Sequence, residues 1–390
     1  MSKERNTEQW HTVTLPALAE NLDRRRVPLT KADRTSGPYP YYGASGIVDY
    51  VEGYLFEGDT LLISEDGANL LARSTPIAFP ATGKYWVNNH AHILRFKSGI
   101  TQRLVELYLE SIPLDSYITG TAQPKLNQSA LNSIPITIPI FLQEQERIVT
   151  YLDEAFERIQ IAKTNAESNI HNARKLFTGW LDRVFSERGS HWVVKRIGDI
   201  AQTQYGLSES MNEDQKGFKT FRMGEVQNGL LIDTGQMKFA DIAHSEFKKY
   251  KLEIGDVLFN RTNSYELVGK TGIFNLEGDY CFASYLVRLG YDRKVIDPRF
   301  LNFYMNSDGF QKRIKTKASR SINQANINAT ILSDELISFP PSLVEQRLAV
   351  SRLEAISAES NRLQELYMAK VRQLDVLRQS FLHQAFSGNL

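Results

Sequence analysis

The sequence predicts an α+β protein in which two strand-rich globular domains alternate with two long helices, related by a pseudo-twofold internal repeat. The first observation is that residues of the first half recur in the second half. The matching pairs are Trp10 and Trp192, Leu15 and Ile197, Leu18 and Ile200, Ala19 and Ala201, Gly58–Leu61 and Gly255–Leu258, Leu126–Gln128 and Ile322–Gln324, Glu144 and Glu345, Gln145 and Gln346, Leu181 and Leu382, and Phe185 and Phe386. The separation grows from 182 positions at the first pair to 201 at the last, which indicates insertions in the second half. A repeat of this length indicates tandem domains and not stacked solenoid units.

The two globular segments are residues 1–142 and 190–341. Both contain short apolar runs separated by turn-forming residues, such as residues 60–63 and 92–96 in the first. Such runs predict short strands. The only strong helical pattern in the first segment lies near residues 102–111.

Two helices are predicted over residues 143–189 and 342–390. Apolar or small residues follow alternating spacings of four and three at Ile148, Leu152, Ala155, Ile159, Ala162, Ala166, Ala173, Leu176 and Trp180, with Asn169 as a polar exception, and the second helix repeats these positions in phase from Ala349 to Phe381. This spacing is typical of a coiled-coil seam. We therefore expect the helices to pair as an antiparallel coiled coil. The alternative is that each helix packs only on its own domain.

Composition excludes several classes of protein. The 390 residues can form two domains with their own cores, and the single cysteine, Cys281, fits a reducing cytoplasm and excludes a disulfide framework. The sequence shows no signal-peptide core and no apolar stretch of membrane-spanning length. The net charge of +1 means that any contact with nucleic acid must come from local patches.

Catalytic and metal-binding motifs are incomplete. Ser264–Thr271 ends like a phosphate-binding loop but has serine in place of its first glycine. His90 and His92 share a strand face, yet no third ligand lies nearby in sequence. Phe339–Ser342 resembles a methyltransferase loop without the Asn or Asp that would bind the target amine, so it predicts a proline hinge. We expect a non-catalytic chain with no metal and no cofactor.

Polar and aromatic residues suited to DNA occur in both globular segments. Candidates in the first are Lys31, Arg34, Tyr39, Tyr41, Tyr42, Ser45, Lys125, Asn127 and Gln128. Candidates in the second are Asn260, Arg261, Thr262, Asn263, Ser264, Lys270, Lys312, Arg313, Lys315, Lys317, Arg320, Asn323 and Gln324. The alternatives are that residues 37–46 form a turn packed on the core, and that residues 312–320 form a solvated helix face.

The combination of motifs resembles the specificity subunit of type I restriction–modification systems. The motifs that carry the resemblance are Tyr39–Tyr50, Gly255–Thr262, the Glu-Gln pairs at Glu144 and Glu345, and Leu377–Gly388. Each motif is weak by itself, but the doubled set in this order is specific and covers essentially the whole chain.

The resemblance implies two target recognition domains, each reading one half of an asymmetric bipartite site in double-stranded DNA. It implies that the long helices set the number of unread bases and bind two methyltransferase subunits. Adenine methylation and ATP-driven cleavage would belong to methyltransferase and restriction subunits. Two alternatives are a DNA methyltransferase with its own recognition domain, which the missing motifs disfavour, and a structural adaptor that binds protein, which the near-neutral charge leaves open.

Overall fold

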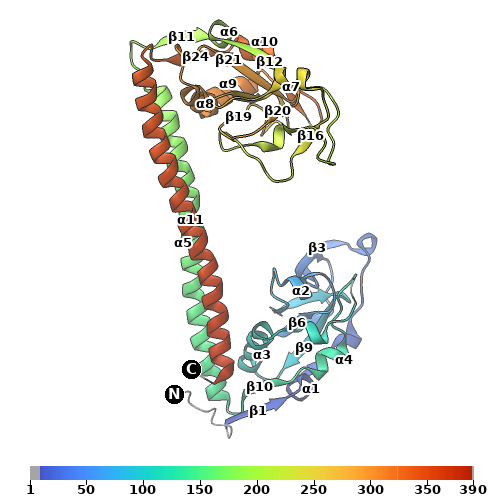
Figure 1. Ribbon diagram of the computed structural model, residues 1–390. Coiled ribbons are helices and arrows are strands. Elements are labelled where there is room, and N and C mark those ends of the chain that lie inside the picture. The colour runs from blue at the N-terminus through green and yellow to red at the C-terminus, as the bar shows by residue number, and fades with distance from the viewer. Residues whose placement is uncertain (1–8, 121, 323, 389–390) are drawn as a thin grey trace. The chain divides into compact units, whose positions relative to one another are not determined.

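The computed structural model describes residues 9–120, 122–322 and 324–388, which form two compact units (Figure 1). Unit 1 comprises Met1–Glu167 with Ala369–Leu390, and unit 2 comprises Ser168–Met368. Each unit therefore contains one globular domain and a part of both long helices.

The long helices are α5 (Leu142–Ser186) and α11 (Leu343–Ser387), each of 45 residues. Within unit 1, the ring of Tyr151 lies 5.9 Å from that of Phe381, and Lys163 forms a 2.8 Å ion pair with Asp375. The partner on α11 moves towards its N-terminus as the position on α5 moves towards its C-terminus. The predicted antiparallel pairing is therefore confirmed within this unit.

In unit 2 two hydrogen bonds join α5 and α11. Ser360 Oγ donates a hydrogen bond to the carbonyl oxygen of Ala173 over 2.7 Å. Arg174 Nε donates to Gln364 Oε1 over the same distance. Ser360 and Ala173 are both buried, so their small side chains let the two backbones approach closely.

The predicted seam is wrong near the end of α5. Leu176 and Trp180 are 48% and 42% exposed, whereas Leu181 is buried and Phe177 is half-buried against Phe303. An undistorted helix has 3.6 residues per turn, so its apolar stripe drifts away from a strict 3.5-residue repeat. The last turns of α5 consequently pack on the globular domain of unit 2.

The globular domain of unit 1 contains two four-stranded sheets with orders β2-β9-β6-β7 and β4-β3-β8-β5, and a β1–β10 pair beside the helices. Its elements are β1 (Trp10–Val13), α1 (Leu15–Leu18), β2 (Ala19–Asn21), η2 (Asp23–Arg25), η3 (Lys31–Asp33), β3 (Ser36–Gly43), β4 (Gly46–Val51), β5 (Phe56–Glu57), β6 (Thr60–Ser64), α2 (Asn69–Ala72), β7 (Ala78–Ala81), β8 (Lys84–Val87), β9 (Ala91–Phe96), α3 (Gly99–Ser111), η4 (Asp115–Tyr117), α4 (Gln128–Ser133) and β10 (Ile136–Pro139). Ser98 caps α3 by accepting a hydrogen bond from the N–H of Thr101.

The globular domain of unit 2 is built on a six-stranded sheet of order β12-β21-β17-β19-β15-β14, with smaller sheets β16-β13-β20 and β18-β23-β22 and a β11–β24 pair. Its elements are β11 (Val193–Arg196), α6 (Ile197–Ile200), β12 (Ala201–Tyr205), β13 (Phe218–Phe221), η5 (Met223–Glu225), β14 (Val226–Gln227), β15 (Leu230–Leu231), β16 (Lys238–Ala240), α7 (His244–Tyr250), β17 (Val257–Asn260), β18 (Thr262–Asn263), β19 (Thr271–Ile273), β20 (Tyr280–Phe282), β21 (Leu286–Tyr291), α8 (Pro298–Asn306), α9 (Asp308–Thr316), β22 (Ser319–Arg320), β23 (Ala325–Asn326), α10 (Ala329–Ser333) and β24 (Leu336–Phe339).

The structure corrects one part of the repeat. The sequence comparison matched Leu126 with Ile322, but Leu126 is buried whereas Ile322 is 99% exposed. The structural counterpart is the buried Ile327, because Asn127 and Asn328 both follow these residues as N-caps of α4 and α10. The offset of 201 positions therefore already holds at this point of the chain, and the insertions lie before it.

Each globular domain shares its core with both long helices. In unit 1, Leu152 of α5 and Leu382 of α11 belong to the same buried cluster as Leu104 of α3. In unit 2, Val350 of α11 belongs to the main cluster, and Phe185 of α5 packs against it. The core therefore fixes each domain on the pair of helices within its own unit.

Candidate nucleic-acid interface

In the first domain, several loops meet at the carboxyl end of β6. The backbone N–H of Glu65 donates to the carbonyl oxygen of His90 (2.9 Å), and the N–H of Leu126 donates to that of Glu65 (2.8 Å). Ser64 Oγ donates to the carbonyl oxygen of Ala44 in the β3–β4 turn. These bonds hold the β3–β4 turn and the segments before β9 and α4 beside one another.

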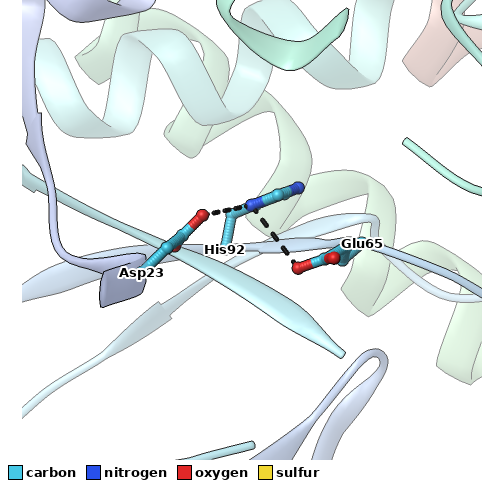
Figure 2. Close-up of side chains that lie close together, drawn as sticks. All are labelled: Asp23, Glu65 and His92. Atoms are coloured by element: carbon cyan, nitrogen blue, oxygen red, sulfur yellow. Dashed lines mark hydrogen bonds and ion pairs between the residues drawn. The ribbon is translucent and has the colours of Figure 1, made fainter. Parts of the chain in front are cut away.

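Figure 2 shows the polar cluster Asp23–Glu65–His92, in which Asp23 and Glu65 both point towards the ring of His92. His92 Nδ1 lies 2.5 Å from Asp23 Oδ2 and 3.7 Å from Glu65 Oε2, and Nε2 lies 2.8 Å from the carbonyl oxygen of Leu126. Arg26 Nη1 donates to Glu65 Oε2 over 2.7 Å. Because a carbonyl oxygen only accepts, Nε2 carries a proton.

This cluster contains ligand types that could hold a metal, with its ligand atoms within 4.8 Å of one another. However, the guanidinium of Arg26 already lies on Glu65, and a divalent cation would have to displace it. Burial alone would raise the pKa of Asp23, but the hydrogen bond and charge of His92, the N–H of Ile93 and the charge of Arg26 together lower it. The geometry fits a hydrogen-bonded charge network better than a metal site.

The predicted aromatic contacts of the first domain are largely structural. Tyr41 is fully buried, and its hydroxyl accepts a hydrogen bond from the N–H of Leu29 over 3.0 Å. The guanidinium of Arg34 lies 4.5 Å from the centre of the Tyr41 ring and pairs with Asp49 at 3.2 Å. Tyr39 and Tyr42 are half-buried. The ring of Tyr39 packs on that of Tyr54, and the ring of Tyr42 packs on those of Phe79 and Tyr85. Burial removes Tyr41 from the proposed interface.

The other predicted residues of the first domain remain accessible. Lys31, Ser45, Lys125 and Gln128 are exposed, with Ser45 in the β3–β4 turn. The backbone of Lys125 forms an isolated antiparallel β-bridge with Asp66, just after β6. Asn127 is also exposed, but its side chain caps α4. The structure thus brings Ser45, Lys125 and the segment before α4 to one region, while Lys31 lies in a separate 3₁₀ helix.

In the second domain the corresponding loops meet at the carboxyl end of β17. Arg261 Nη1 donates to the carbonyl oxygen of Ser284 (3.3 Å), and its Nη2 donates to Asn326 Oδ1 (3.2 Å). Its guanidinium also lies 4.9 Å from the ring centre of Tyr205. Arg261 Nε and both amide atoms of the fully buried Asn260 have no partner among the described residues. Because Asn260 is fully buried, its side chain is no longer a candidate for direct contact with DNA.

The other polar residues after β17 divide by exposure. Thr262 is buried, and its hydroxyl oxygen accepts a hydrogen bond from Asn326 Nδ2. Asn263 and Ser264 are half-buried, and Asn263 Oδ1 accepts from the N–H of Ser264. Asn263 and Ser264 therefore stay in the proposed interface.

Part of the basic segment that sequence predicted as a phosphate strip is paired with protein. Lys317 Nζ lies 2.9 Å from Glu335, which is buried, and Lys312 pairs with Asp308. Arg313 donates to the carbonyl oxygens of Gly309 and Leu336. Asp308 lies one helical turn before Lys312, but Glu335 follows Lys317 by 18 positions, so the local sequence did not reveal that second pairing.

The remaining basic residues gather beside the loop after β18. Lys315 donates to the carbonyl oxygen of Glu266, and burial together with the charge of Lys270 lowers the pKa of Lys315. The guanidinium of Arg320 lies 3.5 Å from the ring centre of Tyr265. Gln324 is exposed just before β23, and Asn323 lies outside the described residues. Lys270, Lys315 and Arg320 therefore remain candidates for phosphate contact.

The sequence interpretation missed a polar cavity of about 570 Å³ in unit 2. Its lining includes Lys219, Arg222 and Lys238 together with Glu213 and Asp233. Lys219 forms an ion pair with Asp233 at 2.7 Å, and Lys238 forms one with Glu213 at 3.0 Å. The alternation of charges along residues 213–238 was the available signal, but no motif marked it.

Two copies of one α+β architecture, each with accessible polar and basic residues at the end of a central strand, define a modular recognition protein. The family described as "Type I restriction modification DNA specificity domain" matches residues 7–170 and 189–368. The chain belongs to this family, and it is accordingly a non-catalytic specificity subunit.

Relatives with known names agree with this assignment. A type I restriction enzyme specificity subunit described from Haemophilus influenzae is 28% identical over 360 residues, covering 90% of this chain and 88% of the relative. The EcoKI specificity subunit of Escherichia coli is 24% identical over 309 residues, covering 75% and 66%.

Solved structures show the same fold. A chain from a study of assembly and conformational transition of a type I restriction–modification system aligns over 100% of both chains with a TM-score of 0.75 and 18% identity. The HsdS subunit of Thermoanaerobacter tengcongensis aligns over 98% of this chain and 97% of its own, with a TM-score of 0.55 and 18% identity. Among the described residues, no helix has both the length and the apolar character required to cross a bilayer.

Proposed function

We propose that this specificity subunit directs a type I restriction–modification complex to an asymmetric bipartite site in double-stranded DNA, with each globular domain reading one half. The observation that carries the proposal is that equivalent loops meet at the end of equivalent strands, β6 and β17, but present different polar side chains. Equivalent frames with different residues are suited to reading different sequences.

The proposed interface consists of a subset of the candidates in each domain, none of them buried. In the first domain these are Lys31, Ser45, Lys125 and Gln128, and in the second Arg261, Asn263, Ser264, Lys270, Lys315, Arg320 and Gln324. Basic residues would bind phosphates and set the position of the domain, whereas Arg261 and Asn263 would reach base edges. Because the proposed target is DNA, we propose that the complex acts in the cytoplasm, where the host DNA lies.

Exposed apolar residues at the start of each long helix favour two docking sites for methyltransferase subunits. In unit 1 these are Ile140, Phe141, Leu142 and Tyr151, and in unit 2 Val194, Leu336, Val344 and Leu348. Large exposed apolar side chains that cluster at one place are typical of protein interfaces. By contrast, Phe156, Phe177 and Phe386 pack within their own units and are not part of the proposed sites. Methylation and ATP-dependent cleavage would belong to methyltransferase and restriction subunits.

The test is to exchange residues 1–142 for the matching segment of a relative, co-express the chain with its methyltransferase subunits, and map methylated adenines across the host genome. We expect one half of the methylated motif to change and the other half to stay the same. The matched control exchanges residues 190–341 and should change only the other half.

Two results would contradict the proposal. A change in both halves after either exchange would show that the domains read DNA jointly. An unchanged motif after both exchanges, from complexes that still methylate, would show that this chain does not determine the sequence. An adaptor without DNA contacts would also lack the salt-dependent DNA affinity that phosphate contacts produce.

A further inference from the structure

The structure identifies a pair of equivalent positions that the sequence repeat does not align. In unit 1, Glu65 donates its N–H to the carbonyl oxygen of His90 and accepts from the N–H of Leu126 at its own carbonyl oxygen. In unit 2, Arg261 makes the same two bonds, to Tyr285 over 3.0 Å and from Ile327 over 2.9 Å. Equal backbone bonding at the end of equivalent strands sends both side chains out at the same place of their domains.

Further contacts support this equivalence. Ser64 and Asn260 are the last residues of β6 and β17, and they pair with Ala91 and Leu286, the first residues of β9 and β21. Glu65 directly follows Ser64, and Arg261 directly follows Asn260. The two domains therefore carry a carboxylate and a guanidinium at one structural position.

In unit 1 the carboxylate of Glu65 is held in one orientation. Arg26 donates to Oε2, and Arg26 is itself fixed by bonds to the carbonyl oxygens of Ala91 (2.8 Å) and Asp23 (3.1 Å). The second oxygen, Oε1, has no hydrogen-bond partner among the described residues, and 23% of the side chain is exposed. A fixed carboxylate with one free acceptor oxygen is suited to accept from an amino group.

In unit 2 the guanidinium of Arg261 lies near the ring of Tyr205 and makes two long hydrogen bonds of 3.2 and 3.3 Å. Its Nε and the neighbouring amide of Asn260 are buried without partners among the described residues. Buried polar atoms without partners are uncommon and require an explanation. Because the internal hydrogen bonds of Arg261 are long and its Nε donor is unused, the guanidinium can give up these bonds and donate to a ligand with stronger acceptors.

We propose that Glu65 and Arg261 are specificity-determining residues that read opposite base chemistry. Arg261 donates to the O6 and N7 acceptors of guanine, and Glu65 accepts from the amino group of cytosine. This inference rests on the proposed function. The guanidinium of Arg26, which lies 2.7 Å from the Glu65 carboxylate, reduces the repulsion between Glu65 and DNA phosphates.

The test uses the full chain in complex with its methyltransferase subunits, with the variants Glu65→Gln and Arg261→Gln. Genome-wide mapping of methylated adenines should show that each variant accepts additional bases at one position, in different halves of the motif. On duplexes with single base substitutions, discrimination at that position should fall by about 5-fold to 100-fold. Matched controls are Asp59→Asn and Arg293→Gln, because both residues are exposed near the opposite ends of β6 and β17.

Three outcomes would overturn the inference. The first is an unchanged motif in both variants, and the second is a uniform loss of methylation without relaxed sequence, which would indicate positioning alone. The third is relaxation of the same half by both variants. The proposed function fails separately, and takes this inference with it, if the unaltered complex methylates no bipartite motif. Because the two variants lie in different units, a folding defect in one still leaves the other as a test.

Discussion

We predict that the packing of the first domain on the long helices becomes less stable as the pH rises, because Glu106 has a buried carboxyl group. Glu106 lies on α3 and contacts Arg103, which also pairs with Asp153 of α5 at 2.7 Å. Burial, together with the negative charges of Asp153 and Glu110, raises the pKa of Glu106 to about 7 against the opposing charge of Arg103. Arg103 is shared between two acids, so it does not offset burial.

The sign of the pH dependence follows from the raised pKa. The unfolded chain releases this proton near pH 4.5, whereas the folded chain keeps it until about pH 7. The contribution to folding stability is therefore largest below pH 4.5, decreases as the pH rises through this window, and is constant above it. At about 1.4 kcal/mol per pKa unit, the whole loss is about 3 kcal/mol. The variant Glu106→Gln removes the titrating group and should be more stable than the unaltered chain at pH 8 by about 2–3 kcal/mol.

Hydrogen–deuterium exchange of peptides from α3, measured at pH 5, 6.5 and 8 and corrected for the intrinsic rate, reports this local stability. Peptides from unit 2 serve as the internal control, since Glu106 lies in unit 1. The reasoning would be refuted if protection of α3 were independent of pH in the unaltered chain, or if Glu106→Gln showed the same pH dependence.

Three further predictions concern the cluster, the basic residues and the helices. Replacing His92 with Leu removes a hydrogen bond to the buried carboxylate of Asp23 and should lower the free energy of unfolding of unit 1 by about 3 kcal/mol. Urea unfolding measures this change, and a loss below about 1 kcal/mol would contradict the prediction. Lys315→Gln should weaken binding to cognate and unrelated DNA alike and reduce the log–log salt slope by about one, whereas Lys312→Gln, already paired within α9, should change it less. Inserting seven residues into α5 between positions 162 and 166 adds about 10 Å of helix and should lengthen the unread spacer in the methylated motif, whereas four residues form a stutter; an unchanged spacer from a folded variant would rule out the helices as the ruler.

The parts of the fold that could be predicted from sequence are those with local signals. The helices α5 and α11 show their periodicity over 45 residues each, and β6 and β9 show as short apolar runs. The end of the seam was mispredicted because the periodicity does not reveal which surface a helix turns towards. Leu176 and Phe177 are adjacent, and only the position of α8 decides that Phe177 packs inward.

The candidate site was less predictable because it depends on distant residues. Asp23, Glu65 and His92 lie in three separate segments, so no local spacing marks them as neighbours. The basic run around Lys317 suggested free cations, but the buried acid that pairs with it, Glu335, comes 18 positions later. Arg261 was recognised from its polar loop, whereas its counterpart Glu65 was not, because an isolated acid is rarely a sign of DNA contact.

The shared core of unit 1 has a consequence for the order of folding. Leu382, Ala385 and Phe386 are buried in the same cluster as residues from β6 and α3, so contacts of the first domain span most of the chain. During synthesis, this domain is translated first but cannot complete its core until residues 369–388 have left the ribosome, whereas unit 2 is complete earlier. A nonsense mutation shortly before Ala369 would therefore keep most of unit 2 but remove core residues from the first domain, which is the domain farthest from it in sequence.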